Sequence, residues 1–279
     1  MELSLQSTLV LNNGVEIPRL GLGVFRAGGD EETAQSVRWA LEAGYRHIDT
    51  AAVYGNVRGV AQGIRDSGVP RDEIFITTKL WNDDMRADRQ REAFEESLER
   101  LGVDYVDLYL IHWPVKGKYV ASWQVLEQLY KEGRIRAIGV SNFLEHHLED
   151  VMKVATVVPA VNQLECHPRL TQKPLKAVCD RLGIAFESWS PLGGSRTGNL
   201  TASPELTAIG AKYGKSAAQV ILRWHLQCGF VVIPKSVHQE RIVANADLYD
   251  FSLSLADMAA IDAMNRDERV GSHPDTFTF

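Results

Sequence analysis

Cysteine is scarce in this sequence, with three in 279 residues: Cys166, Cys179 and Cys228. Their number is odd and no two form a C-x-x-C pair, so neither a disulfide framework nor a cysteine zinc site is indicated. Long apolar runs are missing too, since no stretch approaches the roughly 18 residues that a membrane span needs. The acidic, polar start Met1–Ser4 lacks the basic segment and apolar run of a signal peptide. We therefore expect a cytoplasmic protein without a membrane partner.

Positive charge is in deficit. The chain has 30 Lys and Arg against 36 Asp and Glu, for a net charge of −6 and a pI of about 5.8. A nucleic-acid binder needs a basic surface, so we expect no nucleic-acid partner. A hydrophobic fraction of 45% in a chain of this length allows a core without disulfides. Because α/β barrels often reach about 250 residues as one domain, we predict a single domain over residues 1–279.

Short apolar runs alternate with helical patterns along the chain. Asn13-Gly14 is typical of a two-residue hairpin turn, so a small hairpin is expected within Leu9–Pro18. The runs that follow are Leu20–Val24, His47–Ile48, Ile74–Thr78, Val106–Ile111, Ala137–Val140, Ala160–Val161, Ala185–Trp189 and Phe230–Ile233. Between them, apolar residues recur at helical spacing. Alternating strands and helices predict parallel pairing, and eight such units predict an α/β fold, a (β/α)8 TIM barrel with an N-terminal β-hairpin.

Polar side chains stand at the ends of most of these runs. They are Asp49, Lys79, His112, Ser141, Asn142, Gln163, Trp189, Ser190, Lys235 and Ser236. In such a barrel the chemistry lies at the carboxyl ends of the strands. The start of a loop explains any one of these residues equally well. As a set they favour a functional site, because Lys and Asp directly after buried strands are costly unless paired.

Two glycine motifs begin like phosphate-binding loops and do not complete them. Gly21-Leu22-Gly23 starts like a dinucleotide fingerprint, but Arg26 stands at the third glycine position. Gly214-Lys215-Ser216 ends like a phosphate loop, but Ile209 stands where the first glycine is required. We expect Ser216 to cap the helix that follows.

Several histidines raise the alternative of a metal-dependent hydrolase on a barrel. The candidate ligands are His47, Asp49, His112 and His167. No His-x-His or His-Glu-x-x-His pair is present, and Lys79 would bring a positive charge into the site. We therefore expect no metal and interpret His47 and His167 as structural histidines.

Segments spread over nearly the whole chain resemble the motifs of the aldo-keto reductase family. They are Gly44–Ala51 with Tyr54-Gly55-Asn56, Ile76–Trp81, Asp104–Pro114, Ile138–Phe143, Val161–Gln163, Trp189–Gly193 and Ile233–Ser236. The likeness is nearest to the short prokaryotic-type branch that includes 2,5-diketo-gluconate reductases and prostaglandin F synthases. The resemblance implies a (β/α)8 barrel, carbonyl reduction and NADPH/NADP as the cofactor.

The resemblance implies four catalytic residues. Tyr54 would donate a proton, with Lys79 beside it. Asp49 would pair with Lys79, and His112 would orient the substrate carbonyl. A free phenol has a pKa near 10 and a neighbouring ammonium lowers it, so we expect Lys79 to lower the pKa of Tyr54. A half-buried tyrosine, a structural ion pair and a core histidine are the alternatives, and the four residues together favour catalysis.

The resemblance also implies a set of cofactor contacts. Ser141, Asn142 and Gln163 offer hydroxyl and amide groups to a carboxamide, and Trp189 offers a flat ring to the nicotinamide. The remaining expected contacts are Ser190, Leu192, Lys235, Ser236, Arg241 and Asn245. Two cations and a hydroxyl suit a 2′-phosphate, which predicts NADPH rather than NADH; a solvated basic turn is the alternative.

Three positions depart from the family pattern. Trp189 stands where the family more often has Tyr, and either flat ring serves for stacking. Val57 stands where the family often has Glu. Ala244 stands where relatives often have a Glu that helps to hold the adenine, so the departure concerns cofactor affinity and leaves the chemistry intact.

The substrate side is predicted to be aromatic. Phe25, Trp81 and Trp113 follow three different strands and, with His112, would line an apolar mouth that accepts many small-molecule carbonyls. We expect the C-terminal tail, Asp275–Phe279, to fold over this mouth. The resulting prediction is a monomeric NADPH-dependent reductase of aldehydes and ketones, with a non-catalytic NADPH-binding protein on the same fold as the alternative.

Overall fold

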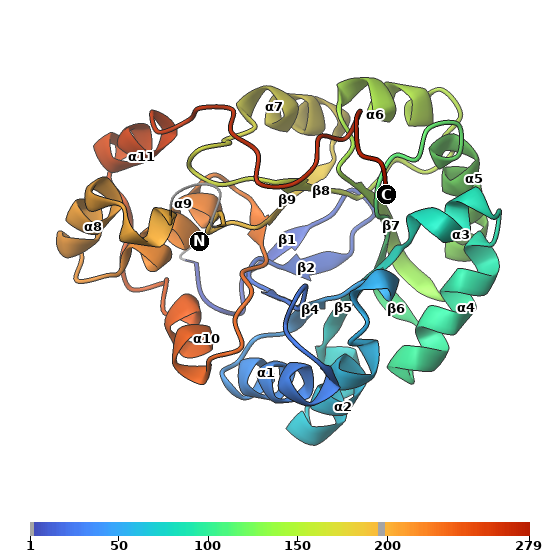
Figure 1. Ribbon diagram of the computed structural model, residues 1–279, viewed down its shortest axis with the longest axis horizontal. Helices are drawn as coiled ribbons and strands as arrows, with labels where there is room; N and C mark the ends of the chain where they lie inside the picture. The colour runs from blue at the N-terminus through green and yellow to red at the C-terminus, as the bar shows by residue number, and fades with distance from the viewer. Residues whose placement is uncertain (1–2, 195–198) are drawn as a thin grey trace.

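The computed structural model describes residues 3–194 and 199–279, and its centre is a parallel sheet. Eight strands of this part of the chain lie in the order β10-β9-β8-β7-β6-β5-β4-β3. Their bounds are β3 Leu22–Gly23, β4 His47–Asp49, β5 Phe75–Leu80, β6 Val106–Ile111, β7 Ile135–Ser141, β8 Val161–Glu165, β9 Ala185–Trp189 and β10 Val231–Val232. Neighbouring strands pair in parallel, so their carboxyl ends meet at one face (Figure 1).

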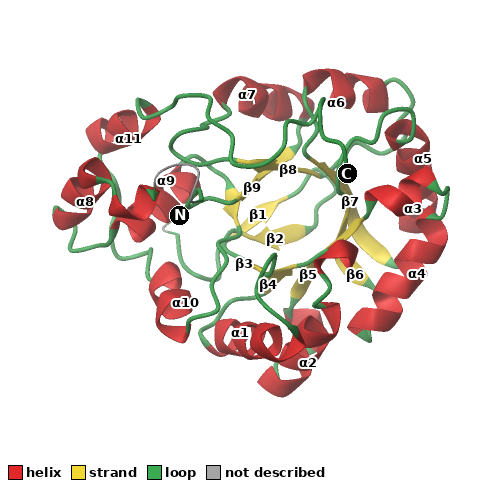
Figure 2. Cartoon of the chain, in the orientation of Figure 1, coloured by secondary structure: helices red, strands yellow, loops and turns green. Residues whose placement is uncertain are grey.

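The two edges of the sheet meet and close it into a barrel. Leu20 bridges Val232, and the amide of Gly21 donates to the Val232 carbonyl at 2.9 Å. The residue must be small here, because a Cβ on Gly21 would lie 2.6 Å from Nδ1 of His47. The predicted (β/α)8 barrel is confirmed, and Figure 2 shows its strands surrounded by helices.

Helices follow each strand and cover the outside of the barrel (Figure 1). Their bounds are α1 Asp30–Glu42, α2 Val57–Ser67, α3 Asn82–Arg86, α4 Gln90–Leu101, α5 Tyr119–Lys131, α6 Glu145–Met152, α7 Lys173–Leu182, α8 Pro204–Ala211, α9 Ala217–Gln227, α10 Gln239–Ala246 and α11 Leu255–Asp262. Short 3-10 turns are η1 Ala52–Tyr54, η2 Arg71–Glu73 and η4 Leu200–Ala202. Ser216 caps α9 by accepting from the Gln219 amide, as predicted. None of the helices in the described ranges combines the length and apolarity needed to cross a bilayer.

A hairpin of β1, Thr8–Val10, and β2, Glu16–Pro18, closes the amino end of the barrel. Its Leu11 and Ile17 are buried against residues of the barrel strands. The hairpin is confirmed, but the predicted two-residue turn is wrong. Gly14 has a φ of 85° while Asn13 does not share it, and the Gly14 amide donates to the Leu11 carbonyl in a longer loop. Asn13 anchors this loop, because its side-chain amide donates to the Arg136 carbonyl at 2.9 Å.

Close packing of α1 on α2 fixes the segment that precedes α2. A Cβ on Gly59 would lie 2.3 Å from the Asp30 carbonyl oxygen, and one on Gly63 would lie 2.4 Å from that of Ala34. Only glycine lets the two helices approach this closely. Because η1 leads directly into α2, this contact helps to place Tyr54 over the barrel.

Candidate active site

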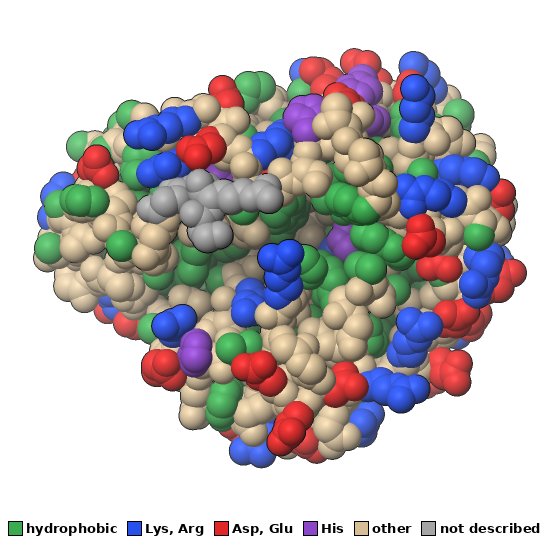
Figure 3. All heavy atoms as spheres, viewed as in Figure 1, with side chains coloured by type: hydrophobic (Ala, Val, Ile, Leu, Met, Phe, Trp, Pro, Cys, Tyr) green, Lys and Arg blue, Asp and Glu red, His purple; other side chains and the backbone are tan. Residues whose placement is uncertain are grey.

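A hollow opens at the carboxyl ends of the barrel strands. Figure 3 shows it near the centre of the molecule, lined mostly by hydrophobic side chains, with a histidine inside and Lys or Arg side chains at its rim. The C-terminal segment crosses the same face in Figure 1. The predicted catalytic residues lie on β4 and β5 or in the segments that follow β4 and β6, at the carboxyl ends of the strands.

Lys79 is the centre of the polar contacts in the hollow. It lies on β5, within the strand and not after it as the sequence indicated, and its side chain is fully buried. Its ammonium donates to Asp49 Oδ1 at 2.6 Å, to the Thr50 carbonyl at 3.0 Å and to the Tyr54 hydroxyl at 3.3 Å. Burial is the largest single influence on Lys79 and lowers its pKa, but the charges of Asp49, Tyr54 and Glu187 and the hydrogen bond to Asp49 together outweigh it, so the pKa lies above its usual value. The ammonium is therefore charged at neutral pH.

Tyr54 ends η1, the turn that joins β4 to α2. The next residue, Gly55, has a φ of 72°, which reverses the chain without strain. Asn56 then fastens the turn, because its side-chain amide donates to the Val24 carbonyl at 2.9 Å and to the Thr33 hydroxyl at 3.1 Å. These contacts hold the phenol over Lys79.

The expectation that Lys79 lowers the pKa of Tyr54 below its usual value is wrong in its net direction. Burial raises the pKa of Tyr54, and the Lys79 ammonium acts in the opposite direction without reversing the shift. The charges of Asp49 and Glu187 add to the increase. The sequence placed Asp49 in this group but did not reveal Glu187 as a neighbour of the phenol. Tyr54 consequently keeps its proton at neutral pH.

His112 completes the predicted group of four. Its ring lies 5.7 Å from the ring of Tyr54 and 5.1 Å from that of Trp81, measured between centroids. Burial, followed by the charge of Lys79, holds the pKa of His112 well below its usual range, so the imidazole is neutral at neutral pH. The carbonyl of His112 accepts from the side-chain amide of Asn142 at 3.0 Å, which ties β6 to β7 at this face.

The residues expected to bind a carboxamide lie together on neighbouring strands: Ser141 ends β7, Gln163 lies within β8 and not after it as the sequence indicated, and Trp189 ends β9. Ser141 Oγ donates to the Gln163 carbonyl at 2.9 Å, and the Trp189 indole N–H donates to Asn142 Oδ1 at 2.9 Å. Gln163 Nε2 donates to Asp49 Oδ2 at 2.8 Å, which joins this group to Lys79. Asn142 and Ser190 have φ angles of 64° and 49°, a conformation that non-glycine residues seldom adopt and that is frequent at functional sites.

The expected phosphate-binding residues lie after β10 and on α10. Lys235 and Arg241 are exposed, and neither forms an ion pair within the described ranges. Ser236 accepts from the His238 amide at 3.1 Å, and Asn245 is buried on the same helix as Arg241. Leu192 is half-buried just before the undescribed residues 195–198. Two unpaired cations beside a buried amide fit an anionic group with a polar ring system.

The predicted aromatic wall is present, and the tail covers part of it. The Phe25 ring, 53% exposed, lies 5.0 Å from that of Tyr54. Phe279 stacks on Trp81 at 5.8 Å and meets the edge of Trp113 at 5.3 Å, and Phe277 contacts Trp113 at 5.1 Å. The tail therefore folds over the mouth, as expected, and narrows it.

Histidines around Asp275 fasten this tail to α6. His146 Nε2 and His147 Nε2 lie 3.0 and 3.3 Å from Asp275 Oδ1. These side chains have spacing that could hold a metal ion. However, His147 Nδ1 accepts from the Leu144 amide at 3.1 Å, which leaves the proton of a neutral ring on Nε2, facing Asp275. The geometry fits a hydrogen-bonded latch better than a metal site.

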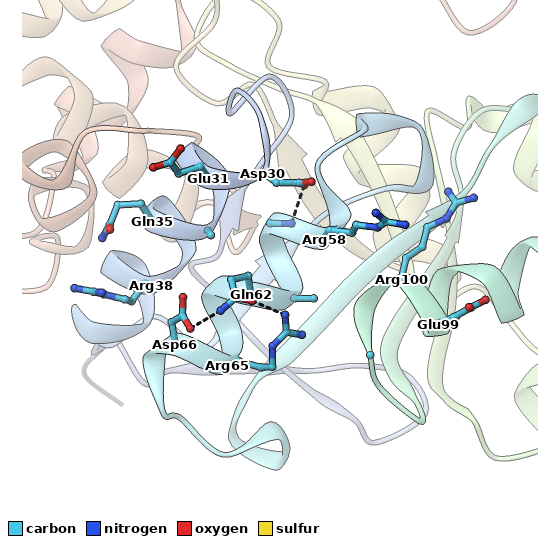
Figure 4. A pocket seen from close by; sticks show the side chains of 14 residues that line it. Asp30, Glu31, Gln35, Arg38, Arg58, Gln62, Arg65, Asp66, Glu99 and Arg100 are labelled. Carbon is cyan, nitrogen blue, oxygen red and sulfur yellow. Dashed lines mark hydrogen bonds between the residues drawn. The ribbon is translucent and has the colours of Figure 1, made fainter.

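A second hollow lies outside the barrel, between α1 and α2 and near the end of α4 (Figure 4). Two of its charged groups are engaged with neighbours: Asp30 Oδ1 accepts from the Gly59 amide at 2.8 Å, and Arg65 donates to Gln62 Oε1 at 2.7 Å. None of the predicted catalytic residues lines it.

Sequence reasoning missed one acidic residue of the site. Glu187 lies inside β9, fully buried, and its Oε2 accepts from Gln163 Nε2 at 3.0 Å. His47, interpreted as structural, lies 3.7 Å from Glu187 Oε1. The available signal was a carboxylate within the otherwise uncharged run Ala185–Trp189, since a charge in a buried strand needs a reason.

Comparison with known proteins adds independent evidence for the family of this chain. The sequence profile described as "Aldo/keto reductase family" matches residues 19–266. The chain is 56% identical to a glyoxal reductase of Bacillus subtilis (strain 168) over 279 residues, covering 100% of both. It is 51% identical to a 9,11-endoperoxide prostaglandin H2 reductase of Trypanosoma cruzi (strain CL Brener), covering 96% of this chain and 95% of the relative.

The fold also closely resembles the folds of solved structures. An aldo-keto reductase of Bombyx mori in complex with NADP superimposes with a TM-score of 0.90 at 40% identity, covering 96% of each chain. Both the sequence profile and the full-length relatives agree with the motifs that the sequence carries. The chain belongs to the aldo/keto reductase family.

Proposed function

We propose that this protein is an NADPH-dependent reductase of aldehydes and ketones, in which Tyr54 gives a proton to the carbonyl oxygen. The observation that carries the proposal is the contact of the buried Lys79 ammonium with both Asp49 and the Tyr54 hydroxyl, at 2.6 and 3.3 Å. The names of the relatives, a glyoxal reductase among them, are consistent with carbonyl reduction. We further propose that residues 1–279 act as one domain and as a monomer.

Tyr54 is suited to donate because it enters the reaction protonated. As the carbonyl oxygen gains negative charge, the phenol hydrogen-bonds to it and transfers its proton. The Lys79 ammonium, 3.3 Å from the phenol oxygen, then stabilises the phenolate that is left. Asp49 keeps Lys79 charged and in place, so it acts through the lysine.

His112 is suited to orient the carbonyl. Its ring is neutral at neutral pH and sits between Tyr54 and Trp81. A neutral imidazole donates one hydrogen bond without bringing a competing charge beside Lys79. With Tyr54 it would hold the carbonyl oxygen between two donors.

The residues at the ends of β7 to β10 fit NADPH, the reduced form of the cofactor bound to the Bombyx mori relative. The hydroxyl and amides of Ser141, Asn142 and Gln163 suit the carboxamide, and the ring of Trp189 suits the nicotinamide face. Lys235 and Arg241, unpaired within the described ranges, suit the 2′-phosphate. When bound there, the cofactor supplies the hydride.

The proposal is tested by following NADPH absorbance with a panel of dicarbonyls, keto-sugars and aromatic aldehydes. We expect Tyr54→Phe to lower kcat by at least about 100-fold, since it removes the proton donor. Tyr109→Phe is the matched control, because that hydroxyl is buried and has no hydrogen-bond partner among the described residues. Turnover that survives Tyr54→Phe would refute the assigned donor. NADPH binding without turnover of any carbonyl would favour a non-catalytic binding role.

A further inference from the structure

Glu187 is a buried acid that forms no ion pair with a Lys or Arg of residues 3–194 and 199–279. It lies on β9 in register with Gln163 of β8, and its side chain is fully inside the barrel. Its Oε2 accepts from Gln163 Nε2 at 3.0 Å. Its Oε1 has no hydrogen-bond partner among the described residues and lies 3.7 Å from His47 Nε2. A buried carboxyl oxygen in this state is costly and calls for a chemical reason.

A single amide connects Glu187 to the proposed catalytic group. The same Gln163 Nε2 also donates to Asp49 Oδ2 at 2.8 Å, and Asp49 Oδ1 accepts from Lys79. The orientation of the Gln163 side chain therefore depends on both carboxyl groups. Since Gln163 is also proposed to contact the carboxamide, a change at Glu187 reaches both the cofactor side and Lys79.

The charges that face Glu187 do not balance if it is ionised. On β4 are Asp49 and His47, on β5 is Lys79, and on η1 is Tyr54, while β10 offers the apolar Val231. Lys79 directs its three hydrogen bonds to Asp49, Thr50 and Tyr54, so Glu187 receives none of them.

His47, the other basic side chain near Glu187, carries no positive charge that could balance it. Burial, followed by the charge of Lys79, lowers the pKa of His47 to about 3, so this ring is neutral. The Lys79 ammonium is thus the single positive charge beside two carboxyl groups, Asp49 and Glu187. It donates a hydrogen bond to Asp49 and none to Glu187. Burial, and then the charge of Asp49, raise the pKa of Glu187 to about 8.

We propose that Glu187 is a positioning residue that works as a neutral carboxyl group, holding the Gln163 amide against Asp49, and that loss of its proton weakens reduction. This inference rests on the proposed reductase function. A proton on Oε1 faces Nε2 of His47, and in alkali it leaves to solvent. The negative charge that remains makes Tyr54 a weaker acid and opposes the negative charge that develops on the carbonyl oxygen.

The test compares the pH dependence of kcat/KM for the wild type and Glu187→Gln between about pH 6 and pH 10, because this quantity reports groups of the free enzyme. In the wild type we expect kcat/KM to fall in alkali as Glu187 loses its proton. One pH unit above the midpoint of this fall, kcat/KM should be about tenfold below its value at neutral pH. Glutamine resembles the neutral acid in shape, so Glu187→Gln should match the wild type within about twofold at pH 6.5 and lack this fall. Glu127→Gln is the matched control, a buried glutamate on α5 that accepts from the Thr156 and Val157 amides and should keep the fall.

An infrared pH titration of the wild type detects the proton of the Glu187 carboxyl group directly. It requires neither turnover nor a variant. We expect a protonated-carboxyl stretch at neutral pH that disappears in alkali, and that is absent from Glu187→Gln if this variant folds. Three results would each overturn the inference while leaving carbonyl reduction standing. They are an alkaline fall of kcat/KM that is unchanged in Glu187→Gln, a Glu187→Gln variant that is inactive at neutral pH, and a wild type without the infrared band. A wild type that reduces no carbonyl at any pH would instead refute the proposed function, and the inference with it.

Discussion

Replacing Lys79 with methionine tests the centre of the site. Methionine keeps the length and apolar stem of lysine and removes the charge, so Asp49 and Glu187 would face each other in the barrel with no cation. The Lys79–Asp49 contact is 2.6 Å long between fully buried groups. At this distance and an effective dielectric constant of about 20, the attraction is about 6 kcal/mol before the cost of burial is subtracted. Removing one partner of such a pair typically costs about 3–5 kcal/mol.

We therefore expect Lys79→Met to lower the free energy of unfolding by about 3–5 kcal/mol at neutral pH. Removing both charges should be milder, so Asp49→Asn/Lys79→Met should recover part of the loss, and the cycle of single and double variants measures the coupling. Urea unfolding followed by tryptophan fluorescence provides the free energies. The matched control is Lys118→Met, which breaks the exposed contact of Lys118 with Asp88 and should cost less than about 1 kcal/mol.

The pH dependence of this variant has a defined sign. Without Lys79, burial raises the pKa of Asp49 in the folded state and nothing of opposite charge counters it. A carboxyl whose folded pKa is raised stabilises the fold when protonated, and this stability is lost as the pH rises through the folded pKa. Lys79→Met should therefore be less destabilised at pH 5 than at pH 8. Unfolding midpoints equal to the wild type at both pH values would show that the pair contributes nothing to the fold.

Three further predictions concern the cofactor, the tail and one helix. Arg241→Ala should weaken NADPH binding by about tenfold or more and leave NADH binding nearly unchanged, since the guanidinium is proposed to read the 2′-phosphate; equal losses in calorimetry would remove that role. Asp275→Asn should speed amide hydrogen exchange in 273–279, because His146 and His147 lose their shared charged partner; unchanged exchange would contradict the latch. Ser216→Ala should destabilise the protein by about 1 kcal/mol through loss of the α9 cap, and an unaltered urea midpoint would refute this.

The sequence predicted best the strands that begin and end on apolar residues, where a single acidic residue inside the run does not hide its limits. The runs Val106–Ile111 and Ala185–Trp189 coincide with β6 and β9. The run Ala160–Val161 was too short, because β8 continues to Glu165 through Asn162 and Gln163. Gln163 points into the barrel and donates to Asp49 and Glu187, whereas Asn162 points outward and donates to the Phe143 carbonyl and to Cys179 of α7. Because polar groups satisfy both side chains, the apolar pattern ends before the strand does.

The predicted catalytic group was brought together by the fold, while its electrostatics were not foreseen. Motifs identified Asp49, Tyr54, Lys79 and His112 by residue type and order. The direction of the Tyr54 pKa shift is set first by the depth of burial, with a smaller contribution from Glu187, which stands far away in the sequence. Neither quantity follows from spacing along the chain, because burial is set by packing of the whole barrel.

The polar interior of the barrel is better explained by chemistry than by stability. A buried ion pair replaced by apolar side chains of similar volume is often neutral or stabilising. Here the centre of the barrel holds Lys79, Asp49, Glu187 and His47. The end of the barrel that the hairpin closes is packed with Leu, Val and Ile side chains. Apolar side chains could fill this space and hold the strands together. A neutral Glu187 beside an ionised Asp49 serves no packing purpose, but it sets the charge seen by Tyr54 to that of one ammonium and one carboxylate. A protein selected for stability alone would have no use for that balance, whereas a proton donor of the proposed kind depends on it.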